Sequence, residues 1–299
     1  LIRGVCRKLK DMGYTIGGFN AAVTSRVLGG SGLSSSAAFE VLLVCILDGL
    51  YNDSIIDGVT RAKISQWVEN EYFGKPSGLM DQSACSIGGL VGIDFKNADP
   101  KIEAYSFDFE ARGFNVVVLA TNSSHDDLTD EYASIPAEMK AVAAALGGKV
   151  LRQFKVQQLI EKLPEVREKT SDRAVMRALH YYDENERVKA CYQAIEEGNL
   201  DAFLQNIILS GESSWKMLQN LYVGGKCEQS LALACALSER MLKGSGAWRV
   251  HGGGFAGTIL AFVPHYKLDA YVQQMDAVFG KGACTVLGIR PVGAKKVEL

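Results

Sequence analysis

The chain has 299 residues, of which 47% are apolar and 22% charged, and its formal net charge at pH 7 is −2. This composition is typical of a folded globular protein with about two domains. The near-neutral charge and the lack of a Lys/Arg cluster exclude nucleic-acid binding as the main function. We also find no signal peptide and no apolar run of about 18 residues, so we expect no membrane partner.

Seven cysteines are scattered along the chain, and no two of them form a C-x-x-C pair. The spacing therefore indicates neither a disulfide framework nor a zinc site. It favours a reducing environment, and we expect the protein to be cytoplasmic.

The first element, residues 1–14, has the apolar pattern of a helix. Because it begins without a methionine or a lead-in, we expect that material upstream of it is missing. Residues 29–47 read GGSGLSSSAAFEVLLVCIL. Small residues there lead into a helix over 37–50 that is apolar on nearly all sides, as in a helix buried within a domain. Glu40 and Asp48 bracket its apolar run.

The glycine- and serine-rich stretch before this helix favours the binding of an anion such as phosphate. A helix N-terminus presents free N–H groups and a positive dipole, and small residues let an anion approach them. The stretch is not a common P-loop, because no Lys follows Gly32, and it is not a dinucleotide motif, because Ser35 stands where the third glycine would be. A plain turn that caps the helix with a hydroxyl remains an alternative.

The remaining pattern predicts an α+β protein in two parts. An amphipathic helix ends near Gly74, and three strands follow it at 89–95, 101–109 and 114–122. Nearly everything from Pro136 to about Met241 has helical patterning. The last stretch returns to a strand, a helix and another strand. We place the boundary between the two parts near residues 110–114.

Three further features could carry chemistry. Glu69 lies near the end of the amphipathic helix, where we expect it on the exposed side. Asp81 lies in GLMDQ (78–82), which we interpret as a glycine-flanked turn. Each acid alone is more often a solvated surface residue or a turn residue. Three consecutive glycines in RVHGGGFAGTI (249–259) are most simply a tight bend with close backbone packing.

The order of these stretches closely resembles the GHMP small-molecule kinases and, within them, the galactokinases. Their G-L-S-S-S-A loop matches residues 32–37, their G-(I/L)-M-D-Q string matches residues 78–82, and their G-G-G-F-x-G motif matches the glycine triplet. A weaker likeness surrounds Tyr132. The resemblance covers essentially the whole chain.

The resemblance implies a two-lobed α+β fold. Residues 1–112 would be the remainder of a lobe like ribosomal protein S5 domain 2, and residues 113–299 would be a ferredoxin-like lobe. It implies ATP-dependent phosphorylation of galactose at the anomeric hydroxyl, with magnesium. Asp81 would be the catalytic residue, as a general base or as an electrostatic partner of the nucleophile. Ser36 and Glu69 would bind the metal, and Tyr132 the sugar. Gly252, Gly253 and Gly254 would bring the backbone close to the site. The ATP-binding residues would be Gly30, Ser31, Gly32, Leu33, Ser34, Ser35 and Ser36.

The chain departs from the family in one large respect. Nothing in it matches the opening signature G-R-x-N-x-x-G-E-H-x-D-Y, which supplies a catalytic arginine and grips the sugar. We therefore expect little or no activity from this chain alone. A related kinase for N-acetylgalactosamine or arabinose, and a non-catalytic galactose sensor, remain alternatives. We interpret His251, before the triplet, as a structural variant. The sequence leaves the oligomeric state open.

Overall fold

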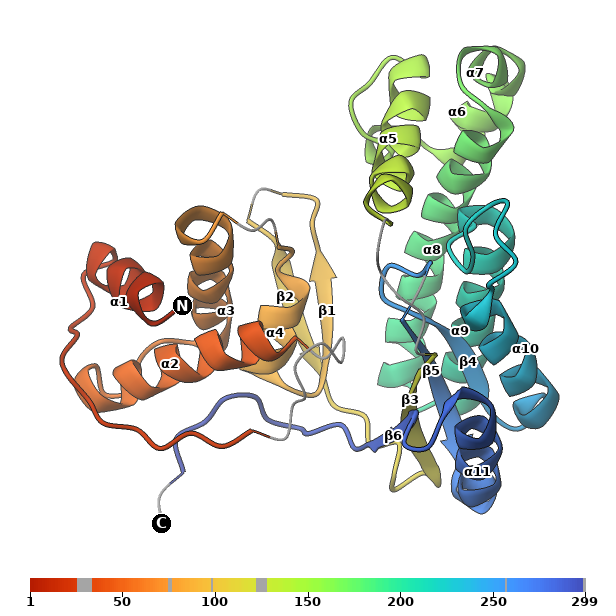
Figure 1. The fold of residues 1–299 in the computed structure, drawn as a ribbon. Coiled ribbons are helices and arrows are strands. Elements are labelled where there is room, and N and C mark those ends of the chain that lie inside the picture. Colours follow the sequence, from red (N-terminus) through yellow and green to blue (C-terminus); the bar gives the residue numbers. More distant parts are fainter. Residues whose placement is uncertain (26–33, 75–76, 98, 122–127, 256, 298–299) are drawn as a thin grey trace. The chain divides into compact units, whose positions relative to one another are not determined.

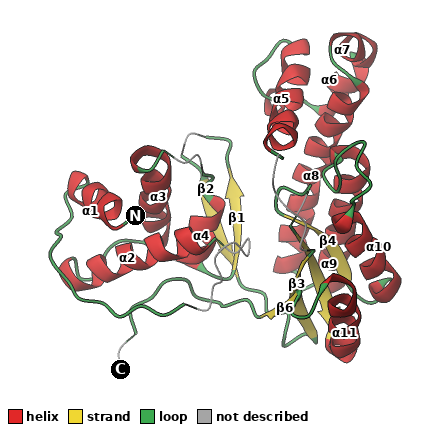
Figure 2. Cartoon of the chain, viewed as in Figure 1, coloured by secondary structure: helices red, strands yellow, loops and turns green. Residues whose placement is uncertain are grey.

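The computed structural model describes residues 1–299 except 26–33, 75–76, 98, 122–127, 256 and 298–299. The chain forms two compact units, one made of Leu1–Phe107 with Ile289–Leu299 and the other of Asp108–Gly288. Both units combine helices with antiparallel strands (Figures 1 and 2), so the expected α+β class is confirmed. No helix among the described residues is both long and apolar enough to cross a membrane.

The first unit is built around one buried helix. It contains helices α1 (Ile2–Asp11), α2 (Ser35–Tyr51), α3 (Gly58–Trp67) and α4 (Met80–Ile87), a π-helical turn (Val68–Tyr72) and a hairpin of β1 (Leu90–Asp94) and β2 (Lys101–Tyr105). Helix α2 supplies Val44 and Leu47 to a core shared with Leu9 of α1 and Ile64 of α3. This burial agrees with the buried helix that the apolar pattern predicted, although Leu42 and Leu50 of α2 are exposed.

The two acids that bracket the apolar run of α2 are themselves buried. Asp48 accepts a hydrogen bond from the backbone N–H of Ile56 at 3.2 Å, and burial raises the pKa of Asp48. Glu40 of α2 is also fully buried. Two acidic side chains of α2 are therefore enclosed in the first unit, and buried polar groups need hydrogen-bond partners.

The C-terminal segment packs on the first unit, whereas the sequence placed it in the second part. The N–H of Gly89 donates to the carbonyl of Arg290 at 2.8 Å, and the N–H of Gly293 donates to the carbonyl of Ile87 at 2.9 Å. A Cβ on Gly293 would lie 2.1 Å from the carbonyl oxygen of Ser86, so only glycine permits this approach. The segment thereby fixes the C-terminal end of α4.

The second unit contains a four-stranded antiparallel sheet in the order β4-β5-β3-β6, with β3 (Phe114–Ala120), β4 (Ala247–His251), β5 (Thr258–Pro264) and β6 (Cys284–Leu287). Its core lies on Val117, Ile259 and Ala261 of the sheet and on Tyr271 and Met275 of a covering helix. The helices are α5 (Thr129–Ala145), α6 (Val156–Glu161), α7 (Leu163–Lys169), α8 (Asp172–Glu196), α9 (Leu200–Ser213), a π-helical turn (Ser214–Leu218), α10 (Ser230–Leu242) and α11 (Leu268–Phe279).

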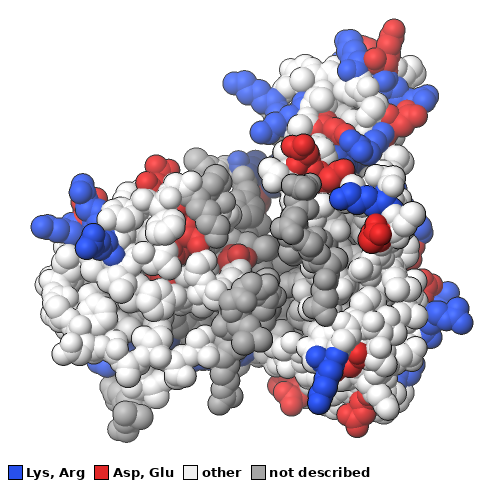
Figure 3. All heavy atoms as spheres, viewed as in Figure 1, with Lys and Arg blue, Asp and Glu red and all other residues white. Residues whose placement is uncertain are grey.

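The expected helical region is confirmed, but its first helix starts earlier than predicted. Helix α5 begins at Thr129 and continues through Pro136. A proline is best tolerated in the first turn of a helix, which is why the sequence suggested a later start. Basic and acidic side chains are mixed on the visible surface of α5, α6 and α7 (Figure 3).

Candidate functional site

The predicted site residues of the first unit lie at the beginnings of two helices and in the π-helical turn. Gly30, Ser31, Gly32 and Leu33 lie outside the described residues. The rest of the predicted phosphate-binding stretch is Ser34, which is the N-cap of α2, and Ser35 and Ser36, which form its first turn.

Ser34 does not cap the helix with its hydroxyl. Its backbone is left-handed (φ 54°, ψ 55°), and no side-chain capping bond forms at this end of α2. The hydroxyl instead donates to Asp81 Oδ2 at 2.5 Å. The hydroxyl-capped turn considered from the sequence is therefore not what Ser34 makes. The N-terminus of α2 keeps the positive end of its dipole without a side-chain cap from the described residues.

Asp81 lies in the first turn of α4, and the expectation of a glycine-flanked turn was wrong. The helix begins directly after Leu79, and Ser83 stabilises it by donating to the carbonyl of Leu79 at 2.7 Å. The string MDQSACSI contains few strong helix formers, so local propensity gives a weak signal there. The half-buried carboxylate of Asp81 contacts the start of α2 through its hydrogen bond with Ser34.

Glu69 is buried, with 5% of its surface exposed, and not on an exposed helix face as predicted. It lies in the π-helical turn that follows α3. A π-helical turn holds more residues than an α-helical one, which shifts the buried face relative to an α-helical projection. Its Oε2 atom lies 3.4 Å from the side-chain amide of Gln82, which donates to it.

Gln82 connects these features, and the sequence reasoning gave it no role although it stands in GLMDQ. It is almost fully buried, follows Asp81 in α4, and also donates to the hydroxyl of Ser77 at 3.1 Å. Its Oε1 atom is buried and accepts no hydrogen bond from the described residues. The first turn of α4 thus brings together Ser34 through Asp81 and Glu69 through Gln82.

The oxygen atoms of Glu69, Gln82 and Ser36 are of the kind that a magnesium ion binds. The described residues contain no group of three or more His, Cys, Asp or Glu that could hold a metal. Magnesium, however, needs only one or two protein carboxylates and takes its other oxygen ligands from water and phosphate. The buried Glu69 carboxylate next to Gln82, whose Oε1 accepts no hydrogen bond from the described residues, fits that requirement. The Ser36 hydroxyl, in the first turn of α2, is a further oxygen of the type that magnesium binds.

Tyr132 and the glycine triplet form a second cluster, within the second unit. The phenol of Tyr132 donates to the carbonyl of Gly254 at 2.9 Å, and its ring packs edge-on against Phe255 with 5.5 Å between centroids. The side-chain amide of Asn220 donates to the carbonyl of Gly253 at 3.0 Å. Burial raises the pKa of Tyr132, so the phenol stays protonated and remains a hydrogen-bond donor.

The triplet makes a close-packed bend, as the simplest interpretation of its sequence predicted. Gly252 and Gly254 both have positive φ. A Cβ on Gly253 would lie 2.8 Å from the Tyr132 ring. His251 ends β4, and its Nδ1 lies 2.9 Å from the hydroxyl of Thr258 on the paired strand. This pairing across the sheet agrees with a structural role for the histidine.

The fold and the matched motifs define a small-molecule kinase of the GHMP class: residues 1–89 match the model of the GHMP kinases N terminal domain. A solved galactokinase of Lactococcus lactis in complex with galactose has the same fold, with a TM-score of 0.78 at 22% identity over 99% of this chain and 76% of its own.

Two curated relatives narrow the class. The galactokinase of Streptomyces coelicolor is 30% identical over 279 residues, which are 92% of this chain and 69% of that protein. The galactokinase of Clostridium tetani is 27% identical over 293 residues, which are 97% of this chain and 71% of that protein. The chain belongs to the galactokinase family and is a kinase-type phosphotransferase.

Proposed function

We propose that this protein transfers the γ-phosphoryl group of ATP to the anomeric hydroxyl of galactose, which yields galactose 1-phosphate and ADP. The observation that carries the proposal is the hydrogen bond of 2.5 Å from the hydroxyl of Ser34, the N-cap of α2, to Asp81 Oδ2. The names of the relatives and the galactose complex of the Lactococcus protein support galactose as the acceptor.

The start of α2 is the proposed phosphate site. We assign residues 30–36, of which 34–36 are described, to supply backbone N–H groups, and the helix dipole favours a negative charge there. Phosphoryl transfer depends mainly on positioning and charge neutralisation, so a cradle of this kind is the main requirement. When it is bound, magnesium neutralises charge on the phosphates. Ser36 and Glu69 are the residues that we assign to hold it.

Asp81 is the proposed catalytic residue. The hydroxyl of Ser34 occupies Oδ2 and thereby fixes the orientation of the carboxylate. We assign Oδ1 to the anomeric hydroxyl of the sugar. Asp81 either accepts the proton of that hydroxyl as a general base or acts as an electrostatic partner of the nucleophilic oxygen. Tyr132 is the proposed sugar contact in the second unit. The glycine triplet lets the backbone approach the bound ligands.

Two further parts of the proposal concern the organisation of the protein. Residues 1–112 and 113–299 are the two proposed lobes, and the boundary of the compact units at Phe107 and Asp108 supports a division in this region. All seven cysteines are free thiols, which supports a cytoplasmic location.

The test measures galactose-dependent ADP release with MgATP and compares the wild type with Asp81→Asn. The assay uses the chain alone and the chain joined to the part of the Clostridium tetani relative that lies outside the matched region. Asp53→Asn is a matched control, because Asp53 is an exposed carboxylate of the same unit whose left-handed backbone suits asparagine. We expect Asp81→Asn to lose about 100-fold or more in turnover, as for the loss of a general base, while nucleotide binding and the control remain at the wild-type level.

The same assay separates the alternatives. A panel with galactose, N-acetylgalactosamine and arabinose identifies the acceptor by its kcat/KM. Preference for another sugar overturns the assignment of galactose. Binding of galactose and MgATP by a folded protein that releases no ADP in either form overturns catalysis and favours a sensor.

A further inference from the structure

Arg177 is a charged side chain enclosed in the second unit, with only 1% of its side chain exposed. It lies in α8, and its guanidinium group reaches two other segments. Nε donates to the carbonyl of Leu218 at 3.0 Å, and NH1 donates to the hydroxyl of Ser134 and to the carboxylate of Glu138, both at 2.9 Å. A buried charge is tolerated only when its donors are paired, and the planar fork of arginine pairs several acceptors at once.

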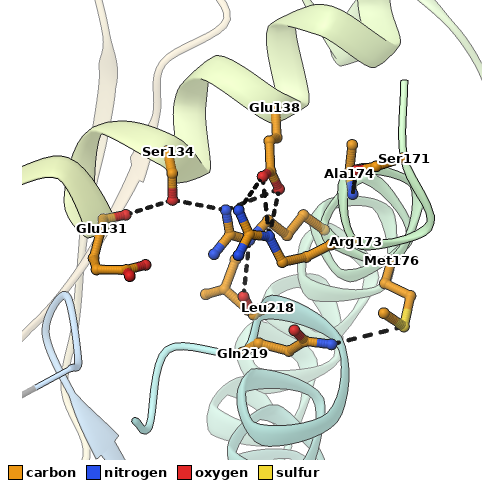
Figure 4. A network of polar contacts seen from close by, with 10 residues as sticks. Glu131, Ser134, Glu138, Ser171, Arg173, Ala174, Met176, Leu218 and Gln219 are labelled. Carbon is orange, nitrogen blue, oxygen red and sulfur yellow. Dashed lines mark hydrogen bonds and ion pairs between the residues drawn. The ribbon is translucent and has the colours of Figure 1, made fainter. Parts of the chain in front are cut away.

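The two segments that Arg177 joins lie next to the residues that hold the glycine triplet. Ser134 lies two positions after Tyr132 in α5, and Leu218, the last residue of the π-helical turn, lies two positions before Asn220. Figure 4 shows Ser134 and Glu138 on α5 facing Leu218 across the network. The guanidinium group therefore sets the separation of α5 from the end of that turn.

Tyr132 and Asn220, which lie in these two segments, both hydrogen-bond to the glycine triplet. Tyr132 donates to the carbonyl of Gly254, and Asn220 donates to the carbonyl of Gly253. The N–H of Phe255 donates back to the carbonyl of Asn220 at 2.5 Å. These hydrogen bonds form a closed path of contacts, which we call the ring. It runs from Arg177 through α5 and the glycine triplet to Leu218 and back to Arg177.

We propose that Arg177 is a positioning residue, which holds Tyr132 and the glycine triplet in register through this ring. Its effect on galactose rests on the proposed function above, whereas its effect on the triplet does not. A purely structural role as a stabiliser of the helices is the competing explanation. It predicts a general loss of stability without a local effect at residues 252–255.

Arg173 offers a matched control. It also pairs with Glu138, through contacts of 2.5 and 3.0 Å, but 46% of its side chain is exposed, and none of the hydrogen bonds that it makes to described residues reaches Leu218. Arg173→Met thus removes an arginine from the same carboxylate without opening the ring. In Arg177→Met, Glu138 keeps Arg173 as its partner, so no carboxylate is left without a cation. Arg177→Lys keeps the charge and can pair with Glu138, but it lacks the fork.

The first test is amide hydrogen exchange resolved to single residues in the wild type and the three variants. Arg177→Met and Arg177→Lys are expected to speed the exchange of the Phe255 amide about tenfold or more relative to the sheet amides of β5. Arg173→Met is expected to leave it unchanged. If Arg177→Met does not fold, Arg177→Lys decides the question, because it keeps the buried charge paired.

The second test is the dissociation constant for galactose, measured by calorimetry well below the unfolding temperature. We expect it to rise about tenfold in Arg177→Lys and to stay at the wild-type value in Arg173→Met. Equal exchange of Phe255 in all variants, or a uniform rise across the whole unit, overturns the proposal. A local rise without weaker galactose binding overturns its ligand part. A wild type that binds no galactose overturns the proposed function instead, and the exchange data still decide the role of Arg177.

Discussion

Replacing Gly254 with alanine should weaken the second unit strongly, because the site has no room for a side chain. Its φ is +81°, where L side chains are strained. A Cβ built there would lie 2.1 Å from the backbone oxygen of Asn220 and 2.6 Å from its Nδ2. Both contacts are well inside ordinary van der Waals distance, and one of them is to the backbone, which cannot swing aside.

The magnitude follows from two costs. A left-handed backbone at a non-glycine residue costs about 1–2 kcal/mol. Relief of the clash must displace Asn220, which breaks its hydrogen bonds with Gly253 and Phe255 at about 1 kcal/mol each. Gly254→Ala should therefore lower the free energy of unfolding by about 3–4 kcal/mol. For a unit of this size, that lowers Tm by about 10 °C.

The neighbouring glycines separate the two costs. Gly252 has a φ of +71°, but a Cβ there would meet no atom of the described residues within 4 Å, so Gly252→Ala should cost only the backbone strain. A Cβ on Gly253 would press on the Tyr132 ring at 2.8 Å, and that ring can move. Gly253→Ala should thus weaken galactose binding more than it lowers stability.

Thermal and urea unfolding followed by circular dichroism, in parallel with galactose titration, measure all three variants. If Gly254→Ala is no less stable than Gly252→Ala, the close approach of Asn220 does not constrain the triplet, and the proposed clash is wrong.

Three further changes test the first unit. Asp57 caps α3, so Asp57→Ala should cost about 1 kcal/mol in urea unfolding at pH 7. Hydrogen bonds to Asp57, first that from the Thr60 hydroxyl, lower the pKa of Asp57 in the folded protein below the ordinary 3.8. The stability that Asp57→Ala removes is therefore fully present above pH 3.8, and it disappears as the pH falls through the lowered pKa. Ser34→Ala frees the Asp81 carboxylate and should lower kcat about tenfold at unchanged Tm; an unchanged kcat in the ADP assay would exclude an orienting role. Glu69→Gln should raise the magnesium concentration for half-maximal nucleotide binding about tenfold, and an equal requirement would remove Glu69 from the metal site.

Several parts of this protein could be predicted from local sequence because their signal is continuous along the chain. The buried helix α2, the strand β3 and the helical region of the second unit all follow from apolar periodicity, which each segment shows by itself. The roles of Asp81 and Glu69 were assigned from the resemblance to a known family, and they stay predictions.

Their surroundings could not be predicted. Asp81 begins a short helix of weak propensity, and that helix is held from outside by the C-terminal segment at Ile87 and Gly89. Glu69 is buried because a π-helical turn interrupts the α-helical phase. Contacts between residues far apart in sequence leave no periodic signal, so neither Gln82 nor Asn220 gained a role from the sequence.

The sequence by itself determined the class of protein, the helix α2 that follows the predicted phosphate-binding stretch and the identity of the residues near it. Only the tertiary structure decided which of these residues meet. It joined Ser34 to Asp81 across 47 positions of sequence, and it enclosed Arg177 between α5 and the carbonyl of Leu218. A side chain is buried, and its hydrogen bonds are fixed, by elements that local propensity does not encode.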